Sequence, residues 1–315
     1  MAEWLFEAGI GEQRAALVDG DRIVEAAIEP DGGGLRVGAV LHARVAALLP
    51  ARTARLTLAD GTEATLLHVP AGTTQGAALT VEIVREALPE PGRAKPPRAI
   101  VSEAMPAPAP DLRARIHATR LPVRTPYPHE SDALEAAGWS ELLDEALSGE
   151  IVFARGALRM TPTPAMTLFD VDGAPPLDAL AVEAAVAVAQ AIRRHGIGGS
   201  IGIDFPTLAG KAPRQAVTDA IDAHLPLPFE RTAMNGFGFV QIVRPRPRAS
   251  IPERLRADPV GAAARAALRI LERTPPSAPR RHRLPPAVLA RITARPDWLA
   301  ELARRTGVTH ELESA

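Results

Sequence analysis

The chain has 315 residues, of which 46% are apolar and 23% are charged. This composition is typical of folded globular proteins and argues against the disordered and fibrous classes. The length suffices for two or three modest domains, because single cores usually stop growing at about 250 to 300 residues. Lysine and arginine together number 36, against 37 aspartates and glutamates, so no overall positive charge attracts the chain to polyanions. Affinity for a nucleic acid would have to come from a local surface.

The chain contains no cysteine, which excludes disulfides and cysteine-ligated zinc. A bound metal ion would therefore have oxygen or histidine ligands, and carboxylates are the main candidates. The first residues carry neither a basic stretch nor an apolar core, and no run of about 18 apolar residues occurs. We therefore expect a cytoplasmic protein without a membrane span.

Short alternating segments dominate the first third of the chain. A strand at 14–18 runs into Asp19-Gly20, a standard hairpin turn, and a second strand follows at 22–24. Residues 1–35 are therefore expected to form a β-hairpin that joins the core of the fold. Residues 36–103 hold short strands separated by glycine-containing turns, which is typical of a Greek-key barrel of the OB type. The strands are expected at 40–49, 54–58, 63–67 and 79–84.

Residues 104–150 are expected to form a linker and a short helical region. Prolines are dense from 88 to 110, and because proline resists both helix and central strand, this stretch indicates a domain border. Apolar residues at near-helical spacing predict a helix over 131–147, with Ser131 as its N-cap.

Strand and helix patterns alternate through residues 151–256, and this alternation predicts an α/β core within an α/β (α+β) fold. Strands are expected at 151–153, 156–160, 165–171, 200–205 and 237–243, and helices at 177–195 and 214–224. Residues 257–315 are expected to form an appended helical tail, with helices at 259–272, 284–292 and 298–306. His195 is interpreted as a positive charge at a helix C-terminus, which the helix dipole favours; a role as a base is the alternative.

Two apolar strands of this core each finish on a carboxylate. Asp170 follows Leu168-Phe169, and Asp204 follows Ile203. If neighbouring strands of one sheet carry them, both carboxylates can converge on a hard divalent cation, and Mg²⁺ suits such a site because it prefers oxygen ligands and keeps several waters. An aspartate after an apolar strand is also often a helix N-cap or a turn residue. Spacing alone leaves both readings open.

The order of motifs along the chain is more specific. The matching segments are Phe169-Asp170-Val171-Asp172, Glu183-Ala184-Ala185, Gly198-Gly199, Ile203-Asp204-Phe205, Phe237-Gly238-Phe239 and Arg244-Pro245-Arg246. This order resembles the ribonuclease E/G family, in which a strand ending Ile-Asp-Val-Asn precedes a Glu-Ala-Ala helix, a Gly-Gly turn and an Ile-Asp-Phe strand. The resemblance covers most of the chain and is thin between 104 and 149. It implies an RNase H-like catalytic core at 151–256, with an N-terminal OB-type RNA-binding barrel.

The resemblance also implies roles for single residues. Asp170 and Asp204 fall on the family's two magnesium-binding aspartates and would be catalytic, while Asp172 replaces a supporting asparagine. An ionised Asp172 cannot donate a hydrogen bond and adds negative charge beside Asp170. The implied activity is metal-dependent endonucleolytic cleavage of single-stranded RNA, in RNA processing or decay.

Several basic positions are candidates for RNA binding. Lys95 falls on a family lysine near the RNA path. Residues 121–125 resemble a Val-Arg-Thr segment that binds the 5′-monophosphate of RNA, which implies that Arg124 and Thr125 act as a 5′-end sensor. A surface arginine in a proline-rich loop is the simpler alternative. Arg244 and Arg246 follow a matched strand and are expected to line the nucleic-acid groove, against the alternative of a solvated basic surface.

Two features leave another function open. Residues 56–67 of the expected barrel contain no aromatic side chain, and stacking on an aromatic ring is worth about 1–3 kcal/mol per base. Together with Asp172, this absence also fits a catalytically impaired RNA-binding or regulatory relative. A small-molecule α/β enzyme is a third reading with little in its favour. The zinc-linking cysteines that join subunits in larger relatives are missing, so a homo-oligomer would need another interface.

Overall fold

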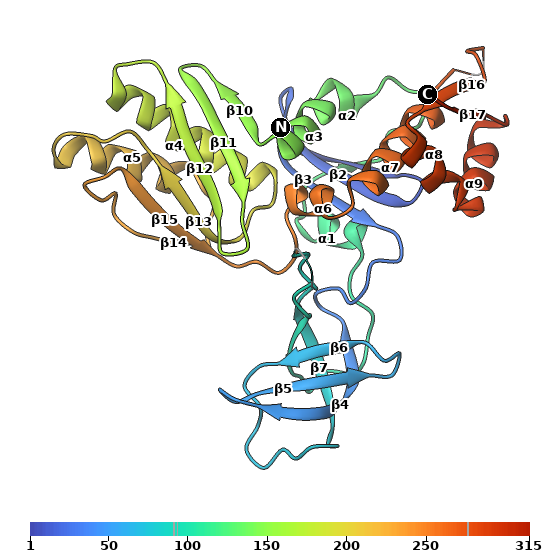
Figure 1. Cartoon of the computed structure of the whole chain (residues 1–315), viewed down its shortest axis with the longest axis horizontal. Helices are drawn as coiled ribbons and strands as arrows, with labels where there is room; N and C mark the ends of the chain where they lie inside the picture. The colour runs from blue at the N-terminus through green and yellow to red at the C-terminus, as the bar shows by residue number, and fades with distance from the viewer. Residues whose placement is uncertain (91, 93, 276) are drawn as a thin grey trace.

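A computed structural model of the chain describes residues 1–90, 92, 94–275 and 277–315. The strands form a four-stranded sheet, a closed five-stranded barrel, a six-stranded sheet and a two-stranded sheet. Figure 1 shows the barrel projecting away from the two larger sheets. The predicted mixed α/β class and the predicted barrel are confirmed. Among the described residues, no helix combines the length and the apolar character needed to cross a bilayer.

The N-terminal sheet consists of β1 (Glu3–Ala8), β2 (Glu12–Asp19), β3 (Arg22–Pro30) and the short strand β9 (Val123–Arg124). Its order is β3-β2-β1-β9, with β9 parallel to β1. Residues 1–35 were expected to form a hairpin joined to the core, but they form three strands of a separate sheet. The strand β1 was missed, and it pairs with β2 on one side and with β9 on the other.

The barrel is built from β4 (Val40–Leu49), β5 (Thr53–Leu58), β6 (Glu63–Leu66), β7 (Ala78–Arg85) and β8 (Arg98–Val101), closed in the order β4-β5-β6-β8-β7. Strand β8 lies within the proline-rich stretch that we expected to be irregular. It forms because Arg98–Val101 is free of proline and pairs with both β6 and β7. Positions 91 and 93 of that stretch lie outside the described residues.

The chain enters and leaves the barrel at neighbouring points. Val40 and Ala107 exchange two backbone hydrogen bonds, each with an N···O distance of 3.0 Å. At the same end of the barrel, the Glu86 carboxylate accepts a hydrogen bond from Arg254 at 2.9 Å. The barrel is therefore inserted between β3 and β9, and it also contacts the second half of the chain.

Residues 104–150 contain α1 (Leu112–Ala118), α2 (Ala133–Ala136) and α3 (Trp139–Ser148). The single helix predicted over 131–147 is wrong, because Gly138 adopts a left-handed conformation with φ of 94° and separates α2 from α3. Asp132, not Ser131, is the N-cap of α2, and its side chain accepts a hydrogen bond from the Glu135 N–H.

The six-stranded sheet holds β10 (Glu150–Phe153), β11 (Gly156–Pro162), β12 (Thr167–Gly173), β13 (Gly199–Asp204), β15 (Phe239–Arg244) and β14 (Glu230–Arg231), in that order. Strands β12 and β13 are parallel because α4 (Leu177–Arg194) carries the chain back between them, and the remaining pairs are antiparallel. Helix α4 and helix α5 (Lys211–His224) pack on one face of this sheet. Side chains on the other face, such as Val152 and Val243, are exposed. We call this the open face.

The C-terminal region contains α6 (Ile251–Ala257), α7 (Pro259–Glu272), α8 (Pro286–Thr293) and α9 (Pro296–Thr306). Helix α7 has the predicted bounds. The parallel strands β16 (Arg281–Leu284) and β17 (Glu311–Ser314) were not predicted, because each is short and needs the other to form its ladder. Residue 276 lies outside the described residues. Helix α7 packs Ala264 and Leu268 against Ile10, which follows β1, and its arginines pair with Glu7 and Glu12 of the N-terminal sheet.

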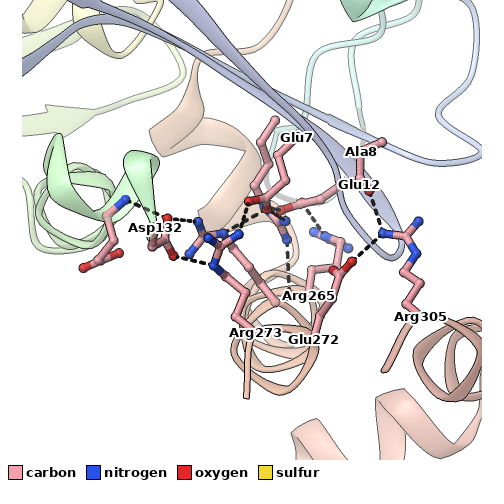
Figure 2. Close-up of polar contacts among 11 residues, drawn as sticks. Glu7, Ala8, Glu12, Asp132, Arg265, Glu272, Arg273 and Arg305 are labelled. Atoms are coloured by element: carbon pink, nitrogen blue, oxygen red, sulfur yellow. Dashed lines mark hydrogen bonds and ion pairs between the residues drawn. The ribbon is translucent and has the colours of Figure 1, made fainter. Parts of the chain in front are cut away.

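A network of buried ion pairs joins α7 to strands β1 and β2 (Figure 2). Arg14 is only 1% exposed, and its Nε donates to Glu12 and its Nη1 to Glu7, both at 2.7 Å. From α7, Arg265 donates to Glu12 at 2.7 Å, and Arg269 donates to Glu7 at 2.9 Å. The two glutamates thus each bridge a strand arginine and a helix arginine.

The same network reaches the loop before α2. Arg269 donates to Asp132 at 2.7 Å, and Arg273 lies 3.0 Å from the same carboxylate. Burial by itself would raise the pKa of Asp132, but the hydrogen bonds from Arg269 and from the Glu135 N–H hold it below its ordinary value. Asp132 is therefore ionised at neutral pH and tied to α7.

Candidate active site

Asp170 and Asp204 are register partners on the two parallel strands β12 and β13. Both side chains are exposed. Neighbouring strands lie about 4.8 Å apart, so the two carboxylates stand side by side on one face of the sheet. A cation site at these two residues requires that neighbouring strands carry both aspartates. Strands β12 and β13 meet this condition.

The direction of these side chains follows from strand alternation. Phe169 and Val171 are buried on β12, and Ile203 is buried on β13, all in the core under α4 and α5. Since successive residues of a strand point to opposite faces, Asp170 and Asp204 must point to the open face. The helices that bury the apolar residues thereby leave the carboxylates accessible to a large substrate.

Arg159 extends the row of charged side chains on the open face. It is the register partner of Asp170 on β11, and its Nε lies 3.8 Å from Oδ2 of Asp172, with both side chains about two-thirds exposed at 66% and 64%. An exposed pair at this separation contributes about 0–1 kcal/mol, yet it places a positive charge beside the additional carboxylate. Arg159 was not among the predicted site residues, although its place between the apolar residues Leu158 and Met160 in a strand predicts that it points away from the core.

The donor set limits the kind of metal site that is compatible with this face. Within the described ranges, no group of three or more histidine, aspartate or glutamate side chains is arranged to hold a metal ion. Asp170 and Asp204 form a pair of oxygen donors. Mg²⁺ is commonly held by one or two carboxylates with waters and substrate phosphates completing its shell. The pair therefore fits a magnesium ion shared with a phosphate substrate, and not a site closed by protein ligands.

An aromatic turn lies next to Asp204. The strand predicted over 237–243 begins only at Phe239, because Gly238 has φ of 96° and belongs to a turn. Phe239 is the register partner of Asp204. Phe237, which precedes Gly238, is 85% exposed. Its exposure was not predicted, because the sequence pattern placed Phe237 within the strand and does not show the turn at Gly238.

Small and apolar residues continue the open face beyond the aspartates. Gly202 lies opposite Leu168 on β12. A Cβ at Gly202 would lie 2.7 Å from the Phe239 ring and 2.8 Å from the Leu168 side chain, so those side chains close over the glycine. The surface beside the carboxylate pair is therefore apolar and filled.

Arg244 and Arg246 are not brought to the aspartates. Arg244 pairs with Gly199 at the opposite end of β13 from Asp204, which is a separation of roughly 17 Å along the strand. It is half-buried, and burial lowers its pKa. Arg246 forms an ion pair with Glu253. Neither arginine therefore lies beside Asp170 and Asp204, and a role of both in lining a nucleic-acid groove stays a prediction.

The remaining predicted RNA contacts lie on other parts of the fold. Lys95 forms an ion pair with Glu90 beside the barrel. Arg124 is in β9 of the N-terminal sheet, with its Nη2 3.7 Å from Glu130, and Thr125 follows it and is exposed. None of these side chains belongs to the six-stranded sheet that carries the aspartates. Their roles stay predictions.

His195 does not carry the charge that we expected at the end of α4. Its side chain is fully buried and its Nε2 lies 3.1 Å from Glu145. Burial lowers the pKa of His195 below its ordinary value, despite the raising effect of Glu145. The ring is therefore largely neutral at pH 7, and the interpretation as a helix-end cation is wrong.

A scan against protein-family models and a search of curated proteins find no match to this chain. The similarity to ribonuclease E/G therefore rests on the order of the quoted motifs.

Proposed function

We propose that this protein is a magnesium-dependent endoribonuclease of the ribonuclease E/G type that cleaves single-stranded RNA. The observation that carries the proposal is the side-by-side placement of Asp170 and Asp204 on an exposed sheet face. Motif order independently selects the same two residues. The closed barrel is the kind of module expected to contact RNA in such a protein.

In this proposal Asp170 and Asp204 hold Mg²⁺, and Asp172 adds negative charge close to them. When bound, the ion would neutralise charge on a phosphodiester and lower the pKa of a coordinated water. Hydrolysis forms a bond between water oxygen and phosphorus and breaks the P–O3′ bond, which leaves a 3′-hydroxyl and a 5′-phosphate. The open face gives a polymer access to both carboxylates without passage through a closed pocket.

The RNase H-like description of residues 151–256 is part of the same proposal. It is supported by the antiparallel strands β10 to β12, followed by the α4 crossover to the parallel strand β13. A cytoplasmic location for the enzyme also belongs to the proposal.

The predicted basic residues can bind RNA phosphates only if their present ion pairs with carboxylates change. Three of these side chains are engaged by carboxylates, so a phosphate must share or displace the acidic partner. The pairs are Lys95–Glu90, Arg124–Glu130 and Arg246–Glu253. A 5′-monophosphate bound by Arg124 and Thr125 would therefore share Arg124 with Glu130 or displace that carboxylate.

The direct test is incubation of the purified protein with a 5′-monophosphorylated, AU-rich single-stranded RNA, in magnesium or in EDTA. We expect endonucleolytic products only in magnesium, and 5′-phosphates on the downstream fragments. Cleavage that persists unchanged in EDTA would refute the role of the metal. An RNA of the same sequence with a 5′-hydroxyl tests the end sensor separately, because it lacks the group that Arg124 is proposed to bind.

A second function is favoured by one observation: among the described residues, no third acidic or histidine side chain is arranged with Asp170 and Asp204 to hold a metal ion. A catalytically impaired relative would bind RNA through the same scaffold and release no product. In the incubation above, RNA binding without cleavage and without dependence on magnesium would support this alternative. Product formation in magnesium would exclude it.

The charges beside the aspartates should tune magnesium affinity in opposite directions. We expect Asp172→Asn to raise, and Arg159→Gln to lower, the magnesium concentration for half-maximal cleavage by about threefold. The interaction of a divalent ion with a unit charge roughly 7 Å away is on the order of 1 kcal/mol in water before salt screening. Magnesium titrations of cleavage rate measure both shifts, with Asp144→Asn on α3 as a matched control. Shifts of the same sign in both variants would contradict this electrostatic account.

A further inference from the structure

Phe237 presents an uncovered ring on a well-fixed turn. Burial of a phenylalanine side chain is worth about 1.5–3 kcal/mol, and this one is 85% exposed. The backbone beneath it is held firmly, because Oδ1 of Asn235 accepts hydrogen bonds from the N–H groups of Phe237 and Phe239, at 2.9 and 3.0 Å. The ring is thus displayed by a fixed turn and contributes little to the core.

The turn is anchored directly beside the carboxylate pair. Phe205, which follows Asp204, donates its N–H to the Gly238 carbonyl at 3.2 Å. A Cβ at Gly238 would lie 2.2 Å from the Phe205 carbonyl oxygen, so the two backbones are in close contact and only glycine fits. Phe237 therefore lies at the end of β13 that carries Asp204, and not at the end with Arg244.

Phe237 differs from the exposed side chain of Tyr127 in how its ring surface is covered. Among the described residues, Tyr127 is also exposed, at 61%, but its ring stacks on His129 with centroids 5.5 Å apart. Phe237 projects from a turn with its surface open. Residues 56–67 of the barrel contain no aromatic residue, so an aromatic platform for bases is not expected on that segment.

We propose that Phe237 is a base-stacking residue, which binds an unpaired RNA base next to the phosphodiester held at Asp170 and Asp204. This inference rests on the proposed function for the identity of the polymer. The ring face accepts any base, so it selects for unpaired nucleotides and tolerates sequence. A base within a duplex is already stacked on its neighbours and is not free to cover the ring.

A tryptophan at this position would report stacking directly. The three native tryptophans are buried, with Trp4, Trp139 and Trp298 exposed by 3%, 2% and 6%, so Phe237→Trp adds an accessible indole. We expect a short unstructured RNA, added in EDTA so that no cleavage occurs, to quench its emission saturably. A duplex of the same sequence should quench it far less. Equal quenching by the duplex would overturn stacking on an unpaired base.

Binding measurements complete the test. Phe237→Ala is expected to raise the Kd for single-stranded RNA in EDTA by roughly 5- to 150-fold, the range of one lost stack, while Phe237→Tyr should retain affinity. Ile270→Ala, at a 67% exposed position on α7 and away from the open face, is the matched control and should bind as wild type does. An unchanged Kd in Phe237→Ala overturns the inference.

The two proposals fail in different ways. Magnesium-dependent cleavage by the wild type, with no effect of Phe237→Ala on binding, would retain the enzyme and reject the stacking role. Quenching and weakened binding without any cleavage by the wild type would retain the stacking role and reject the enzyme.

Discussion

Replacement of Arg14 by methionine is expected to destabilise the fold by about 3–5 kcal/mol, the usual effect of removing one partner from a buried ion pair. The guanidinium is 1% exposed and donates to Glu7, to Glu12 and to the Arg265 carbonyl. Methionine fills similar space but donates no hydrogen bond, so two buried carboxylates lose a partner. Urea denaturation followed by tryptophan fluorescence measures the change.

Tryptophan is a suitable reporter because Trp298 of α9 lies against the turn between β1 and β2. A Cβ at Gly11 would be 2.6 Å from its ring. Arg55→Met provides the control, since Arg55 is 53% exposed and lies 3.7 Å from Glu63, and such a pair contributes less than about 1 kcal/mol. If Arg14→Met had no larger effect than this control, the network would not be an important source of stability.

Asp170→Asn and Asp204→Asn are each expected to lower the cleavage rate by at least about a thousandfold. Stabilisation of the transition state by a metal ion is worth several kcal/mol, and each 1.4 kcal/mol corresponds to about a tenfold change in rate. Asparagine keeps the size of the side chain but removes the charge that attracts the ion. Since both residues are proposed to hold the same ion, the double variant should be scarcely slower than either single variant.

Controls separate this effect from loss of structure. Both aspartates are exposed, so each variant should unfold at the wild-type urea midpoint and bind single-stranded RNA in EDTA with unchanged Kd. Asp144→Asn, an exposed substitution of the same type, should cleave normally. Wild-type turnover in either Asp170→Asn or Asp204→Asn would show that the carboxylate pair is not the metal site.

Long periodic segments were predictable because their own residues determine them. Helix α7 begins at Pro259 after the capping residue Asp258, and proline at the first helical position is a strong local signal. The strands β8 and β9 were missed because each is short and is fixed by partners far away in the sequence. The break at Gly138 was missed because the sequence alone does not show that this glycine adopts a positive φ.

At the candidate site, alternation and motif order predicted the two aspartates but not what surrounds them. Arg244 follows the matched strand closely in sequence, yet β15 runs antiparallel to β13 and carries it away from Asp204. The position of Arg159 beside Asp170 could be predicted only from the register between β11 and β12, which depends on the turn joining them. Exposure of Phe237 depends on the turn at Gly238, and no pattern of apolar residues distinguishes an exposed ring from a buried one.

The paired backbone hydrogen bonds between Val40 and Ala107 hold the two ends of the barrel segment together. For the N-terminal sheet, residues 41–106 are therefore one long insertion whose ends already meet. Loop-closure entropy grows slowly with length, by about 0.6 kcal/mol for each doubling. A change in the length of this insertion therefore costs the N-terminal sheet little loop-closure free energy, and the sheet can keep its pairing when the barrel is shortened or extended.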